Sequence, residues 1–139
     1  MEPEDEGANA LDVAVAAAMA RQYADDARTF LGRFAQFLES ALGENAVTIQ
    51  RAGFFGGDNR PVKRVEFTLP ELGGTKATRY ALEEDGKHGV LAQRIQVVRN
   101  IALKTETLSV EEWIGLVVVA IGTEAERNKS ARDALNRFL

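Results

Sequence analysis

Apolar residues recur at helical spacing in the first third of the chain. Their separations of four and three positions place them on one stripe of a helix, which three leucines widen. The stripe consists of Tyr23, Ala27, Phe30, Phe34, Phe37 and Ala41, with Leu31, Leu38 and Leu42 beside it. The alanine-rich segment "ALDVAVAAAMA" precedes it, and Gly43 follows as an expected helix stop. This pattern predicts a long amphipathic helix from about residue 9, which can break near residue 21.

The middle of the chain changes to a period of two, which is typical of strands. The alternating apolar positions are Val47 and Ile49, then Val65, Phe67 and Leu69, then Tyr80 and Leu82. Pro70 ends the second run, and the Asp85-Gly86 pair after the third run signals a hairpin. These three runs are therefore expected to be antiparallel neighbours.

A fourth run, over residues 90–104, is expected to form one long strand. Its apolar positions of one parity are Leu91, Ile95, Val97, Ile101 and Leu103. Arg99 shares this parity and interrupts it, so we expect a β-bulge or a buried ion pair at that position. Four consecutive strands are arranged most simply as an antiparallel meander.

The last element begins with a capping box, the four residues Ser109-Val110-Glu111-Glu112. Residues 113–121 are apolar apart from Gly115, so this part of the helix has no polar face. After Gly122 the pattern becomes amphipathic again. The predicted fold class is α+β, with a four-stranded antiparallel meander sheet between a long N-terminal helix and a C-terminal helix.

The length of 139 residues fits one domain with a substantial core. The residues expected to be buried together are Phe30, Phe34, Phe37, Val65, Phe67, Leu91, Ile95 and Trp113. Residues 1–8 are acidic and lack apolar anchors, so we expect a disordered tail there and a single domain over residues 9–139.

Charge is unevenly distributed along the chain. The net charge is −4, and the first six residues contain four acids and no base, so the remainder is neutral. There is no cysteine, which excludes a disulfide framework, a thiolate metal site and a thiol nucleophile. No apolar run approaches the roughly 20 residues of a membrane span. A cytoplasmic protein without a membrane anchor is the expectation.

Few residues are suited to catalysis. His88 is the only histidine, and it lies in the turn sequence "DGKHG" without an obvious partner. The two glycine-rich stretches lack the spacing of a phosphate-binding loop and precede no predicted helix. The consecutive acids Glu83, Glu84 and Asp85 do not match calcium-loop spacing. We therefore expect neither an enzyme nor a bound cofactor or metal.

The stretch "RAGFFGGDNRPVKR", residues 51–64, is the candidate binding segment. It combines an aromatic pair with four cations and one acid. The candidate partner-binding residues are Arg51, Phe54, Phe55, Arg60, Lys63 and Arg64. The rings can fold inward as a lid on the core, or they can be displayed for a protein partner or for single-stranded nucleic acid. The neutral body and a pI of 5.1 weigh against nucleic acid.

Two apolar surfaces predict association. The second face of the sheet is expected to carry small apolar residues, namely Ala52, Val62, Ala81, Val90, Ala92, Val98 and Ala102. Residues 113–121 also require burial all round. The alanine-rich segment 9–20 can cover one of these surfaces within the chain, and a second copy can cover the other, so we expect a homodimer rather than a compact monomer.

In size, acidity and helix-flanked sheet, the chain is similar to the secretion chaperones, which are dimeric. This resemblance is one of overall fold and implies no functional residue. The predicted function is a non-enzymatic protein-interaction module, an adaptor or chaperone-like subunit, which acts through apolar helix and sheet surfaces. The alternative is a weak binder of single-stranded nucleic acid or anions that uses the basic aromatic loop 51–64.

Overall fold

A computed structural model describes residues 10–53, 60–70, 75–86, 89–125 and 129–138. In chain order the elements are α1 (Ala10–Asp25), α2 (Ala27–Leu42), η1 (Glu44–Ala46), β1 (Val47–Arg51), β2 (Val62–Pro70), β3 (Lys76–Glu84), β4 (Val90–Val98), β5 (Ile101–Leu108), α3 (Val110–Ala125) and α4 (Lys129–Phe138). The predicted α+β class with an antiparallel meander is confirmed. The predicted acidic tail lies outside the described residues.

The sheet contains five strands in the order β1-β2-β3-β4-β5, not the four that were predicted. The expected long strand 90–104 is a hairpin, because the chain turns at Arg99 and Asn100. Both residues have positive φ, 52° and 68°, as in the two-residue turns that match the twist of antiparallel strands. Arg99 therefore marks a turn, and the prediction of a bulge or a buried ion pair at this position was wrong.

The residues of β4 that reach the helix-facing core differ from those predicted. Ala92 and Val90 pack toward the helices, whereas Leu91, which was predicted to be in the core, is 36% exposed. Ile95 is buried, at 7% exposure, but it lies on the opposite face of the sheet and outside the helix-facing core. The parity assigned to the predicted strand 90–104 was wrong, because its core positions were placed on the other face.

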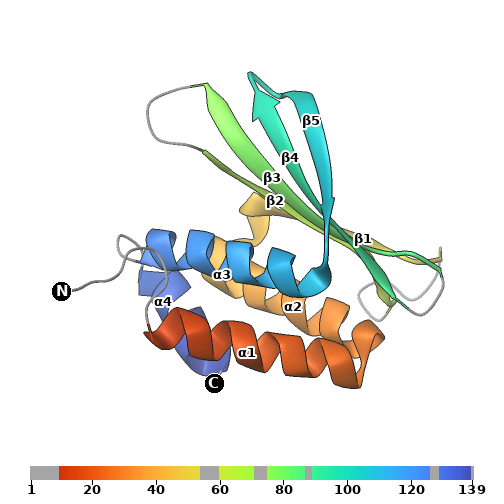
Figure 1. Cartoon of the computed structure of the whole chain (residues 1–139), viewed down its shortest axis with the longest axis vertical. Coiled ribbons are helices and arrows are strands. Elements are labelled where there is room, and N and C mark those ends of the chain that lie inside the picture. Colours follow the sequence, from red (N-terminus) through yellow and green to blue (C-terminus); the bar gives the residue numbers. More distant parts are fainter. Residues whose placement is uncertain (1–9, 54–59, 71–74, 87–88, 126–128, 139) are drawn as a thin grey trace.

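The helices form two layers on one face of the sheet (Figure 1). Helices α2 and α3 contact the strands, while α1 and α4 pack mainly on α2 and α3. The predicted long N-terminal helix breaks at Asp26 rather than near residue 21. The Asp26 carboxylate accepts hydrogen bonds from the backbone N–H of Thr29, at 3.2 Å, and from its hydroxyl, at 2.6 Å. This is the capping arrangement that starts a new helix.

Aromatic rings join the helices to the sheet in the centre of the core. The ring centroid of Phe34 lies 5.3 Å from that of Trp113, and Trp113 lies 6.4 Å from Tyr80, which stacks on Phe67. The indole N–H of Trp113 donates to the backbone oxygen of Gln93 at 2.9 Å, so its polar atom is satisfied where it is buried. Six of the eight predicted core residues are confirmed in this cluster, namely Phe30, Phe34, Phe37, Val65, Phe67 and Trp113.

Helix α3 begins where the capping box predicted. The Ser109 hydroxyl oxygen accepts the backbone N–H of Glu112 at 3.1 Å. Val117, Val118 and Ile121 are completely buried, and α3 contacts α1, α4 and β4. The apolar segment of α3 is therefore covered within the chain, as in the alternative that assigned this role to residues 9–20. Among the described residues, no helix is long and apolar enough to cross a membrane.

Candidate interaction surface

Two arginines of the candidate loop close its neck. Arg51 Nη1 donates to the backbone oxygen of Arg60 at 2.8 Å, and Arg60 Nη1 donates to the backbone oxygen of Gly53. The backbone N–H of Ala52 also donates to the backbone oxygen of Pro61 at 2.9 Å. These guanidinium groups hold the two ends of the loop together. Phe54 and Phe55 lie outside the described residues. Their positions would decide whether the loop covers the core or exposes its aromatic rings to a partner.

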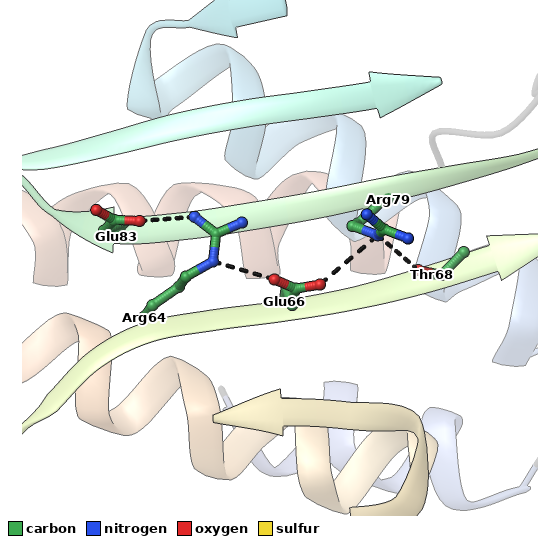
Figure 2. Close-up of polar contacts among 5 residues, drawn as sticks. All are labelled: Arg64, Glu66, Thr68, Arg79 and Glu83. Carbon is green, nitrogen blue, oxygen red and sulfur yellow. Dashed lines mark hydrogen bonds and ion pairs between the residues drawn. The ribbon is translucent and has the colours of Figure 1, made fainter. Parts of the chain in front are cut away.

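The other two predicted cations, Lys63 and Arg64, have different environments. Lys63 is exposed at a register shift between β1 and β2, where it has no counterpart in the pairing. Arg64 lies on the sheet face away from the helices. Its Nε donates to Glu66 at 3.0 Å and its Nη1 donates to Glu83 at 2.7 Å (Figure 2). The predicted basic patch is therefore divided, and Arg64 is paired with two carboxylates.

Arg64 belongs to a row of alternating charges that crosses β2 and β3 (Figure 2). Glu66 also pairs with Arg79, whose Nε lies 3.6 Å from its second oxygen. Burial lowers the pKa of Arg64, but the hydrogen bonds to Glu83 and Glu66 outweigh burial and raise this pKa above its ordinary value. The row holds two acids and two bases, so it is neutral and lessens the support for an anion site there.

The sheet face away from the helices is only partly apolar. Ala81, Ile95 and Val97 are buried in its centre, and none of the described helices covers them. Val62, Val90 and Ala92, which were predicted to lie on this face, pack instead against the helix-facing core. The expected small-residue face was wrong for these residues, because it depended on the wrong parity for β4 and on continuous pairing in β2.

A cavity of about 270 Å³ lies beneath the neck of the candidate loop. Leu31 of α2 and the strand residues Val62 and Val90 supply apolar walls, and among the described residues that line it Glu84 alone is charged. A carboxylate in an apolar cavity does not favour phosphate or another anion. Within the described part of the chain, no three residues with metal-ligating side chains cluster together. His88 lies outside the described residues.

The last strand presents the clearest unpartnered surface, which we call the β5 edge, residues 101–108. In the described sheet, β5 pairs with β4 on one side and with no strand on the other. Ile101 is 64% exposed and Leu103 is 62% exposed. In Figure 1 the turn end of the β4–β5 hairpin stands away from the helices. Sequence reasoning missed this surface because Arg99-Asn100 was not recognised as a turn.

Two charged residues of the β5 edge share one face of the strand. Arg94 on β4 donates from Nη2 to Glu106 Oε1 at 2.7 Å, and Lys104 is exposed two positions earlier on the same strand. Hydrogen bonding and charge attraction from Arg94 hold the pKa of the Glu106 carboxyl below its usual range. The edge therefore carries one base, one acid and two large exposed apolar side chains. Comparisons with protein families, curated proteins and solved structures find no match to this chain.

Proposed function

We propose that this protein is a non-enzymatic protein-interaction module, an adaptor or chaperone-like subunit, that binds protein through its β5 edge. The observation that carries the proposal is the exposure of Ile101 and Leu103 on a strand whose outer side is unpaired among the described strands. Natural sheets usually cover or charge such an edge, because its free N–H and C=O groups attract another chain. An exposed edge is also a common docking site for extended segments.

The energetics favour the sheet over the helices as the contact surface. Residues 113–121 are packed against α1, α4 and β4, so they leave little apolar area for a partner. Ile101 and Leu103, by contrast, lose contact with water only when another molecule covers them. Full burial of such a side chain is worth roughly 1.5–3 kcal/mol, before the cost of association is subtracted. Backbone hydrogen bonds along the edge would add specificity for an extended strand.

Site-specific photocrosslinking in cells that express the protein tests this proposal. A photoreactive amino acid replaces Leu103 in one variant. In the matched control it replaces Val13, which is 61% exposed on α1 and lies on a surface to which no role is assigned. We expect a protein adduct from position 103 and none from position 13. No adduct from position 103, or the same adduct from both positions, would contradict the proposal.

A further inference from the structure

We infer that the occupant of the β5 edge is a second copy of this chain, with the two β5 strands paired antiparallel about a twofold axis. This inference rests on the proposed role of the β5 edge and names its partner. The two sheets would then continue into one another, with the helices of both copies on the same face. A twofold axis requires the same strand to contact itself, which antiparallel pairing permits.

Backbone geometry limits the registers in which a strand can pair with its own copy. Along a strand, successive residues direct their N–H and C=O groups to opposite edges, and antiparallel partners must be of the same type. The twofold axis between the two strands must therefore lie midway between one residue and its own copy, rather than at a position between two successive residues. Leu103 has no counterpart in the β4–β5 pairing, because the register shifts between Gln96 and Val97, so the regular part of the strand begins at Lys104. Near the middle of the strand, the candidate residues are Lys104, Thr105 and Glu106.

The charges of the strand distinguish among these three registers. An axis at Lys104 places two ammonium groups opposite each other, and an axis at Glu106 does the same with two carboxylates. Like charges that are directly opposite destabilise a strand pair, and opposite charges stabilise it. An axis at Thr105 places Lys104 of each copy opposite the partner's Glu106, which makes two symmetric ion pairs.

The Thr105 register also gives the exposed leucine a neighbour. It places Leu103, the residue at the register shift, next to the partner's Thr107, whose exposed side chain carries a methyl group. The other edge of the sheet, formed by β1, offers less exposed apolar surface to a partner. The five-residue strand β1 has its apolar residues Val47 and Ile49 packed in the helix-facing core. Self-complementary charge and exposed apolar surface thus meet on β5 rather than on β1.

The wild-type chain and two variants test the inference by sedimentation at concentrations from about 1 to 100 µM. The wild type is expected to form a dimer. Lys104→Glu places four carboxylates at the edge and is expected to weaken the dimer by at least about tenfold, because two attractive pairs become repulsive. Lys104→Glu combined with Glu106→Lys restores opposite charges across the axis, and dimer formation is expected to return. Circular dichroism verifies that each variant is folded.

A single cysteine measures the register directly, since the chain has no other cysteine. Antiparallel partners have Cα atoms about 4.5–5.5 Å apart, within disulfide range. Thr105→Cys is expected to form a covalent dimer under mild oxidation. Thr48→Cys, exposed on the opposite edge strand, is the matched control and is expected to stay monomeric on a denaturing gel.

The outcomes separate this inference from the proposed function. A monomer at all concentrations, a dimer insensitive to Lys104→Glu, or equal crosslinking of Thr105→Cys and Thr48→Cys overturns the inference. If the adduct at position 103 then contains a different protein, the proposed function still stands. A charge-sensitive dimer that crosslinks through Thr105→Cys supports both.

Discussion

The close approach between the first and third helices makes a sharp prediction about Gly122. A methyl group at that position would lie 2.7 Å from both carboxylate oxygens of Asp12, whereas ordinary contacts begin near 3.4 Å. Asp12 is buried at 3% exposure, so its carboxylate has little room to move aside. Gly115 belongs to the same helix but has no atom within 4 Å of an added methyl group. The two glycines are therefore a matched pair.

The expected magnitudes follow from two opposing effects. Replacing glycine by alanine inside a helix raises the free energy of unfolding by about 1 kcal/mol, because the backbone loses less freedom on folding. Gly115→Ala is expected to gain about this amount. Gly122→Ala has the same favourable contribution, but overpacking against Asp12 lowers the free energy of unfolding by about 1–3 kcal/mol. The net effect should be a loss of stability of roughly 0–2 kcal/mol. In an Asp12→Ala background the clash is gone, and Gly122→Ala should stabilise.

Urea unfolding followed by circular dichroism measures this double-mutant cycle. A change of 1 kcal/mol shifts the midpoint by roughly 0.5 M for a typical slope. The cycle cancels whatever Asp12→Ala costs by itself, so the difference between backgrounds reports the contact alone. If Gly122→Ala stabilises the protein as much as Gly115→Ala in both backgrounds, the packing of α1 on α3 described above is incorrect.

Four further predictions address the core, the cap, the edge and the loop. Phe34→Ala is expected to cost about 3–5 kcal/mol in urea unfolding, because the ring is fully buried among other rings, and a cost under about 1 kcal/mol would contradict its place in the core. Ser109→Ala should cost about 1 kcal/mol in the same assay through loss of the N-cap hydrogen bond, and an unchanged midpoint would refute this. The lowered pKa of Glu106 means that its ion pair stabilises the fold above the ordinary carboxyl pKa of 4.5 and loses this effect as the pH falls through the folded pKa. The stability difference between wild type and Glu106→Gln should therefore shrink as unfolding is measured from pH 7 down to pH 3, and a constant difference would disagree. We expect no binding of a single-stranded oligonucleotide at about 50 mM salt; if binding appears, alanine at Lys63 and Arg64 should flatten its salt dependence by about two phosphate contacts.

The elements with strong local signals could be predicted from the sequence. The stripe through Phe30 and Phe34, the strand with Val65 and Phe67, and the cap at Ser109 all follow from residues close together in the chain. The class and the meander were correct for this reason. The helix break was misplaced because Asp26 caps through its side chain in the middle of a continuous apolar stripe.

The hairpin at the end of the sheet could not be read in the same way. Arg99 and Asn100 adopt positive φ without a glycine, so the usual turn signal was weak, and the alternation continued through them with plausible parity. The faces of Leu91 and Ala92 were assigned wrongly for a different reason, because Ile95 and Val97 are buried on the face away from the helices and their alternation was taken to mark the core. The missed turn concealed the β5 edge, since an exposed edge strand depends on strand order rather than on any local motif. The separation of Arg64 from the other cations of the loop could not be predicted either, because it depends on an ion pair with Glu83, which lies on the neighbouring strand.

The position of α1 has a consequence for how the chain is assembled during its synthesis. This helix leaves the ribosome before α3 and α4, two of the helices on which it packs. Contacts between distant parts of a chain form only after the intervening segment is ordered or complete. α1 can pack on α2 once both have emerged, but its contacts with α3 and α4 must wait until the strands between them have been made. The packing of α1 is therefore complete only after the whole sheet has been translated.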